Sequence, residues 1–201
     1  MLELKRRTAL LVTGTPGTGK TTISRPLARL LNADYLDPTT LLTREGLNYT
    51  YDENRGTRIV SLPRLRSSLN SLARGAARGL VLDSHVCFKI GPSPRLARAI
   101  VLRCNPAVLE RRLRQKHWSK RKISENVLAE ILDICLWNSV KNYGWERTSE
   151  IDTTNKRPAQ VVQLTIRALR ERKIQKQPKV NWLSALNRRG ILGHYLREVR
   201  T

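Results

Sequence analysis

Cysteines, long apolar runs and acidic side chains are all scarce in this chain of 201 residues. The three cysteines, Cys87, Cys104 and Cys135, are odd in number and widely spaced within apolar segments, which argues against a disulfide framework or a zinc site. We expect buried thiols. No apolar run approaches the roughly 18 residues that span a membrane, and residues 1–7 enter the first expected strand without a signal-peptide core. These absences predict a cytoplasmic protein, or a nuclear one in a eukaryote.

The shortage of acids leaves a large positive charge. There are 16 Asp and Glu residues against 38 Lys and Arg residues, so the formal net charge is +22. A field of this sign attracts polyanions and exceeds what a small nucleotide requires, which predicts a larger anionic partner such as RNA or an RNA-bound assembly. The alternative is an arginine-rich surface without such a partner. An apolar content of 40% is enough for a core and excludes a disordered chain.

Short apolar runs alternate with longer helical patterns along the chain. Strands are expected at residues 9–13, 34–37, 80–83, 99–104 and 149–153, and helices at residues 21–31, 62–77, 106–116, 124–143 and 158–173. This order predicts an α/β fold in which helices cover both faces of a parallel five-stranded sheet. Nucleotide chemistry is then expected at the carboxyl ends of the strands.

A complete Walker A loop follows the first expected strand. It comprises Gly14, Thr15, Pro16, Gly17, Thr18, Gly19, Lys20 and Thr21. Its glycines let backbone N–H groups turn around phosphates, Lys20 supplies a positive charge there, and the Thr21 hydroxyl can hold Mg²⁺. The alternative is a glycine-rich turn, but the fixed spacing and the strand-to-helix flanks favour binding of a nucleoside triphosphate such as ATP.

Asp83 ends the apolar run at residues 80–82, and His85 lies two residues further on. An aspartate at this position suits a Walker B element, whose carboxylate can order a water molecule on the Mg²⁺ that Thr21 holds. His85 would point to the same side as Asp83 if the strand pleat continued, where it could position water or phosphate. The alternatives are a turn aspartate and a structural histidine.

Basic side chains crowd residues 111–122, among them Arg112 and Lys116. Phosphoryl transfer requires cations around the transferring group, so this segment is predicted to be a mobile cationic lid. The alternative is a solvated basic helix end.

These motifs occur in an order that resembles adenylate kinase isoenzyme 6, the coilin-interacting nuclear ATPase family. The resemblance rests on residues 14–22, which extend the loop to Thr22, on Asp83-Ser84-His85, on Arg112 with Lys116, and on residues 122–126 and 151–155. It implies a three-layer α/β/α P-loop nucleoside monophosphate kinase domain over residues 1–173, with adenylate kinase and ATPase activity. It also implies a role in small ribosomal subunit maturation, through a platform ribosomal protein beside rRNA.

The resemblance also implies roles for individual residues. Thr39 and Arg44 would grip the acceptor monophosphate, preferably AMP, within a segment at about residues 38–78; an ordinary capped helix is the alternative. Arg112 would be the first lid arginine, in a lid at about residues 111–123. Lys116 stands where the second lid arginine is expected, so it keeps the charge but loses the bidentate fork.

The exit of the last strand resembles the family's adenine-binding loop. Asn155, Lys156 and Arg157 would be neighbours of the base, although a plain strand-to-helix connection would look the same.

The resemblance fades before residues 174–201, which form a basic extension. Apolar residues recur there at helical spacing around Trp182 and Tyr195, and Gly190 separates the two groups. We expect two short amphipathic helices. They could bind RNA through arginines and aromatic rings, or they could pack on the kinase core.

Overall fold

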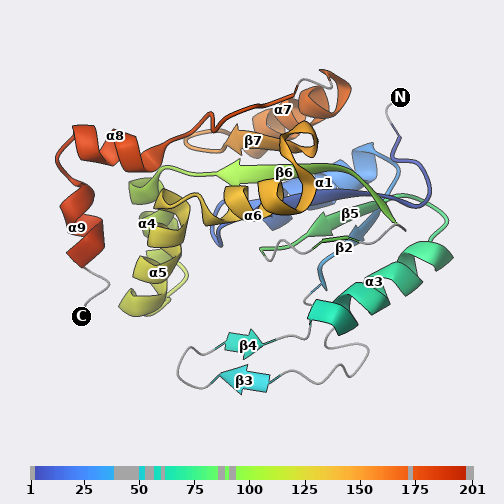
Figure 1. The fold of residues 1–201 in the computed structure, drawn as a ribbon, viewed down its shortest axis with the longest axis horizontal. Coiled ribbons are helices and arrows are strands. Elements are labelled where there is room, and N and C mark those ends of the chain that lie inside the picture. Colours follow the sequence, from blue (N-terminus) through green and yellow to red (C-terminus); the bar gives the residue numbers. More distant parts are fainter. Residues whose placement is uncertain are drawn as a thin grey trace.

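The chain folds around a parallel five-stranded sheet, as the sequence predicts. The computed structural model describes residues 3–38, 50–52, 57–59, 62–85, 89–90, 94–171 and 174–197. The sheet order is β2 (Asp34–Leu36), β5 (Leu80–Asp83), β1 (Thr8–Gly14), β6 (Arg95–Arg103) and β7 (Thr148–Asp152), as Figure 1 shows. All neighbouring strands in it are parallel. The carboxyl end of the central strand β1 is therefore flanked by the ends of β5 and β6.

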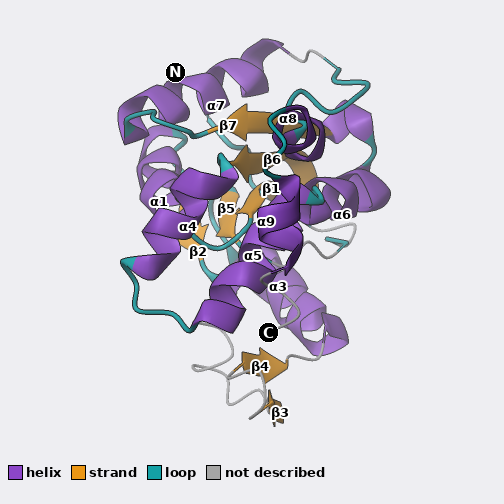
Figure 2. Cartoon of the chain, turned by 90° about the vertical axis from the view of Figure 1, so that its left-hand side faces the viewer, coloured by secondary structure: helices purple, strands orange, loops and turns teal. Residues whose placement is uncertain are grey.

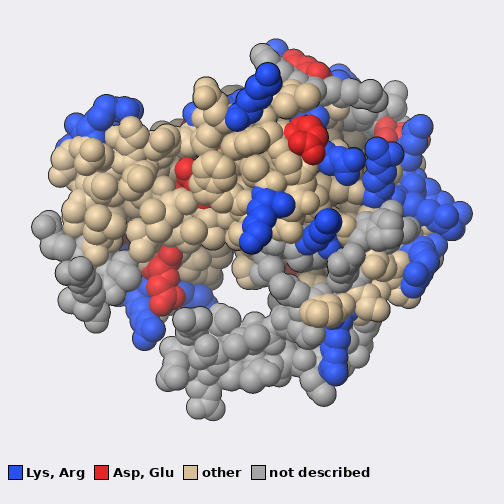
Figure 3. Space-filling model, viewed as in Figure 1, with Lys and Arg blue, Asp and Glu red and all other residues tan. Residues whose placement is uncertain are grey.

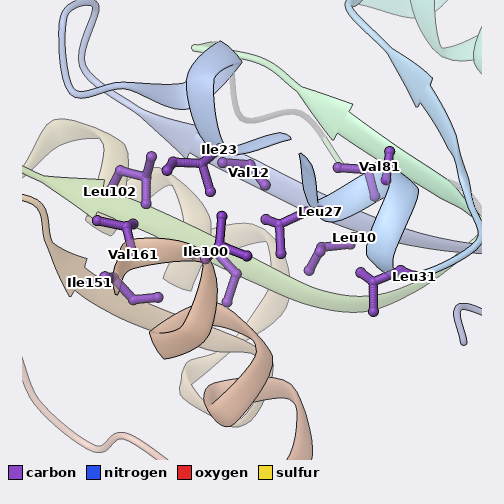
Figure 4. Close-up of a cluster of buried hydrophobic side chains, with 12 residues drawn as sticks. Leu10, Val12, Ile23, Leu27, Leu31, Val81, Ile100, Leu102, Ile151 and Val161 are labelled. Atoms are coloured by element: carbon purple, nitrogen blue, oxygen red, sulfur yellow. The ribbon is translucent and has the colours of Figure 1, made fainter. Parts of the chain in front are cut away.

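Helices cover both faces of this sheet. On one face lie α1 (Lys20–Leu30) and α7 (Pro158–Glu171), and on the other α3 (Leu62–Gly75) and α6 (Ile134–Tyr143) (Figure 2). Strand β1 serves both layers because successive side chains point to opposite faces. Leu10 and Val12 pack with Leu27 of α1 (Figure 4), whereas Leu11 packs with Leu69 of α3. The three-layer α/β/α prediction is confirmed.

The prediction of one continuous helix at residues 124–143 is wrong. The structure divides this region into α5 (Lys120–Ile131) and α6, and Asp133 between them has a left-handed φ of 57°. The cause is a tertiary contact: a guanidinium nitrogen of the buried Arg103 donates to the Glu130 carbonyl and to the Asp133 carboxylate. The periodicity of the sequence carries no sign of this contact.

Two other differences are smaller. Strand β6 begins at Arg95, earlier than expected, because it pairs with the start of β1 at Thr8. An antiparallel hairpin, β3 (Thr50–Asp52) and β4 (Thr57–Ile59), was not predicted and lies within the segment proposed to bind the acceptor.

The C-terminal extension forms two short helices, as expected, and it packs on the core. Helices α8 (Trp182–Arg188) and α9 (Leu192–Arg197) contact α5. Their buried residues Leu186 and Tyr195 join a hydrophobic cluster with Leu109 and Leu113 of α4 (Pro106–Arg114). Of the two readings that the sequence left open for this segment, packing on the core is the one the structure shows.

The cysteines and the helix lengths test two expectations from the composition, of which burial of the thiols is met in full by Cys104 alone among the described cysteines. Cys104 is buried and Cys135 is partly buried, while Cys87 lies outside the described residues. Burial raises the pKa of the Cys104 thiol to about 11. In the part of the chain that the structure describes, no helix is long and apolar enough to cross a bilayer.

Candidate active site

The Walker A residues form a tight loop between β1 and α1. Gly14 has a φ of 141°, and a Cβ there would lie 2.4 Å from the carbonyl oxygen of Leu102. Gly17 has a φ of 92°, and a Cβ there would meet the Leu109 side chain at 2.9 Å. Both positions require glycine because the conformation and the space exclude a side chain. The loop is thus pressed between β6 and α4, as a rigid phosphate cradle needs to be.

Lys20 lies at the centre of this loop. Its Nζ donates to the carbonyl oxygens of Gly14 at 2.8 Å and of Thr15 at 3.2 Å. Burial lowers the pKa of Lys20, and Asp83 and Glu130 only partly oppose that effect. The ammonium therefore gains less from nearby acids than it loses by desolvation. A phosphate group would correct this imbalance, so the loop fits the anion that its sequence predicts.

Asp83 stands beside the loop, at the end of β5. It pairs in register with Val12 of β1, and its side chain is buried. The hydroxyl of Tyr35 on β2 donates to the Asp83 carboxylate at 3.1 Å, which fixes the carboxylate's orientation. Thr21 is exposed at the start of α1. A hydroxyl and an oriented carboxylate are donors that suit Mg²⁺.

His85 follows Asp83 and lines the same cleft as Lys20. Although part of this residue faces solvent, the burial of the remainder and then the nearby Lys20 lower its pKa below the usual value of 6.5. The imidazole is therefore neutral at neutral pH. A neutral ring can accept a hydrogen bond from water, which is the property that orientation of a nucleophile requires.

A cleft of about 1170 Å³ joins the Walker A residues and His85, whereas Asp83 does not line it. The predicted residues that line it are Pro16, Gly17, Thr18, Gly19, Lys20, Thr21, Thr22, His85, Arg112, Lys116 and Lys156. This volume lies somewhat above the usual range of roughly 300–1,000 Å³ for small-molecule sites, so a nucleoside triphosphate fits within it. The structure thus brings residues from four separate segments to one site.

The predicted lid forms one wall of the cleft. An Arg112 guanidinium nitrogen donates to the Gly17 carbonyl at 3.3 Å, so this cation already lies against the phosphate loop. Lys116 is exposed at the rim. The Lys122 ammonium lies 4.5 Å from the centre of the Trp118 ring, and both residues line the cleft. Sequence reasoning placed the charges of this wall but not its aromatic face.

The loop after β7 lies on the other side of the cleft. The Thr153 hydroxyl lies 3.1 Å from the Thr18 carbonyl and 2.8 Å from that of Arg103, so this loop is tied to the Walker A segment. Lys156 lines the cleft, whereas Asn155 and Arg157 are exposed and do not line it. Contact of these three residues with a base stays a prediction.

Two predicted residues have no described position. Thr39 and Arg44 lie outside the described residues, so the acceptor-binding role given to them remains a prediction.

Three more residues contribute to the site, and sequence reasoning gave none of them a role there. Tyr35 orients Asp83, Thr153 lies against the loop, and Glu130 accepts a hydrogen bond from Thr15. Thr153 was noted only as part of a motif. Tyr35 and Glu130 come from distant segments and belong to no motif, so only tertiary structure reveals them.

Comparison with known proteins finds relatives that match most of the chain. A family model described as "AAA domain" matches residues 10–133. A protein of Methanocaldococcus jannaschii is 32% identical over 173 residues, which are 86% of this chain and 92% of that protein. One from Archaeoglobus fulgidus is 33% identical over 194 residues, 94% of this chain and 99% of that protein. Both are named "Putative adenylate kinase".

The chain belongs to the P-loop nucleoside monophosphate kinase family. A solved gluconokinase from Sinorhizobium meliloti aligns with a TM-score of 0.53 at 17% identity. The alignment covers 82% of this chain and 93% of the gluconokinase chain. That likeness concerns the fold alone. As a P-loop kinase, the chain is a phosphotransferase that binds nucleotides.

Proposed function

We propose that this P-loop kinase transfers the γ-phosphoryl group of ATP·Mg²⁺ to AMP, giving two ADP, and that it also hydrolyses ATP. One observation carries the proposal: the cleft places Lys20, His85, Arg112 and Lys116 together at the carboxyl ends of β1 and β5. The relatives' names support adenylate kinase activity. Phosphoryl transfer depends mostly on positioning and charge neutralisation, which these residues supply.

Each residue of the cleft has a distinct part in this reaction. ATP supplies the phosphoryl group, and its Mg²⁺ spreads the phosphate charge. Thr21 and Asp83 would hold the metal. Lys20 neutralises the phosphates, and the Arg112 guanidinium, already against Gly17, can turn to the transferring group. Lys116 at the rim adds a cation without a bidentate fork.

The acceptor side rests on the sequence. We propose that Thr39 and Arg44 hold the monophosphate of AMP and that the loop at residues 155–157 lies near the donor base. The acceptor preference can be tested directly. The measurement is ADP formation from ATP with AMP, CMP, UMP, GMP or shikimate added separately. AMP is expected to accelerate turnover most. Acceleration by shikimate or CMP instead would assign this site to another small acceptor.

His85 is expected to act in hydrolysis more than in binding. His85→Ala should slow single-turnover ATP hydrolysis by about 10²-fold, the lower end of what a positioned proton-transfer or water-orienting group contributes, because the neutral ring would no longer orient the water. ATP affinity should stay within about twofold of the parent's, since other groups hold the phosphates. Lys141→Ala, an exposed residue on α6 outside the cleft, is the control. Equal losses in affinity and hydrolysis would refute this role.

A second candidate function is a nucleotide-gated assembly factor of the isoenzyme 6 type. The observation that favours it is the net charge of +22, with lysines and arginines spread over the face in Figure 3. Its partners would be a platform protein of the small ribosomal subunit and rRNA. The two functions differ in what stimulates ATP turnover. Stimulation by the ribosomal partner and not by AMP would favour the assembly factor.

A further inference from the structure

The phosphate loop is connected to the C-terminal extension through one buried carboxylate. Glu130 of α5 is 1% exposed. Its Oε2 accepts a hydrogen bond from the Thr15 hydroxyl at 2.5 Å, and its Oε1 accepts one from the Trp182 indole N–H at 3.2 Å. Thr15 belongs to the Walker A loop and Trp182 begins α8. The two segments are far apart in sequence, and a single side chain joins them.

On the loop side, Thr15 is directly linked to the phosphate-binding cation. Its carbonyl oxygen accepts hydrogen bonds from the Lys20 ammonium at 3.2 Å and from the Thr18 hydroxyl at 2.8 Å. The Thr15 side chain is fully buried and has Glu130 as its acceptor. A shift of Glu130 would therefore move the residue whose carbonyl helps to place Lys20.

On the other side, Glu130 is held by an ionic network that the extension completes. Arg103 Nε donates to Glu130 at 2.8 Å, and another Arg103 nitrogen donates to Glu150 at 2.6 Å. Glu150 in turn accepts from the backbone N–H of Lys179 and from the Gln175 side chain, each at 2.6 Å. Residues 175–182 thus anchor two of the three carboxylates that hold Arg103, those of Glu130 and Glu150.

Apolar packing gives a second connection between the same two segments. Leu109 and Leu113 of α4 lie directly against Gly17 of the loop. They are so close that a Cβ atom at position 17 would clash with both side chains. The same two leucines share a buried cluster with Leu186 of α8 and Tyr195 of α9. Because close-packed groups transmit displacement, the extension supports the loop through α4 as well as through Glu130.

We propose that the C-terminal extension is a positioning element of the nucleotide site, in which Trp182 and Glu130 hold the Walker A loop in its phosphate-binding shape. Glu130 and Trp182 would act through Thr15 without touching nucleotide. This inference rests on ATP binding at the loop, which the proposed function shares, and not on AMP as the acceptor. It builds on the packing of the extension on the core, which was one of the two possibilities that the sequence left open.

The test compares Trp182→Phe with Trp137→Phe. Both remove one indole N–H and keep an aromatic ring, but Trp137 is 49% exposed on α6, outside the cleft. Trp182→Phe is expected to raise the calorimetric Kd for ATP by about three- to tenfold, as the loss of a hydrogen bond to a charged group allows. Trp137→Phe should leave it unchanged. A Kd for Trp182→Phe within twofold of the parent's would overturn the proposal.

A double-mutant cycle separates positioning from a general loss of stability. Thr15→Val removes the hydroxyl at the opposite end of the connection. If Glu130 couples the two ends, Thr15→Val and Trp182→Phe together should raise the Kd by less than the product of their separate effects. Additive effects would mean that the two residues act independently, which would also overturn the proposal.

A second variant covers the case in which Trp182→Phe fails to fold. Glu130→Gln keeps the size of the side chain and removes its charge, and it should raise the Kd for ATP at least as much. An unchanged Kd would refute the role of Glu130. The readout is ATP binding, so the proposal can succeed or fail whether or not AMP stimulates turnover in the parent protein.

Discussion

Lys20→Ala is expected to lower ATP turnover by at least about 10²-fold, because the transition state for phosphoryl transfer would lose a cation held at the phosphates. The thermal unfolding temperature should change little. Burial lowers the pKa of Lys20, so the folded state disfavours its charged form, and alanine removes that desolvation cost. The measurement is steady-state ADP formation beside the thermal unfolding temperature of each protein.

The matched control is Lys141→Ala, an exposed lysine on α6 outside the cleft. It should retain parental turnover. If Lys20→Ala stayed within about twofold of the parent, the assignment of residues 14–22 to phosphate binding would be wrong. A large fall in its unfolding temperature would instead give Lys20 a structural role.

Arg103→Leu is expected to cost about 3–5 kcal/mol of unfolding free energy, because it leaves buried carboxylates without their cation. Arg103 is 1% exposed and forms ion pairs with Glu130, Asp133 and Glu150. Burial disfavours its charge, but these three carboxylates outweigh that effect and raise its pKa. The same substitution removes the contacts that end α5, so the junction with α6 should lose order too.

The control for this prediction is Arg114→Leu. Arg114 is 55% exposed and pairs with Glu110 one helical turn away, so its loss should change the unfolding free energy by no more than about 0.5 kcal/mol. Urea unfolding of both variants beside the parent gives the comparison. A cost below about 1 kcal/mol for Arg103→Leu would mean that the buried network contributes little to stability.

The sequence by itself determined the layered fold and the phosphate loop. Both are local signals: apolar runs of strand length alternate with helical periods, and the glycines and lysine at 14–20 have a spacing that only such a loop requires. Asp83 and His85 could be selected as candidates for the same reason, because a strand end places its last residues at a known edge of the sheet. The charge of the lid was visible as well, since seven basic residues occupy positions 111–122.

The partners of these residues could be decided only by the tertiary structure. Tyr35 reaches Asp83 across a strand pair, and Glu130 reaches Thr15 across 115 positions of sequence. Such contacts depend on how strands and helices pack, which no periodicity or motif records. The break at Asp133 and the packing of α8 and α9 have the same origin. Arg103 and Glu130 read as ordinary charges on a strand and a helix, and burial makes them the ionic centre that joins the phosphate loop to the C-terminal extension.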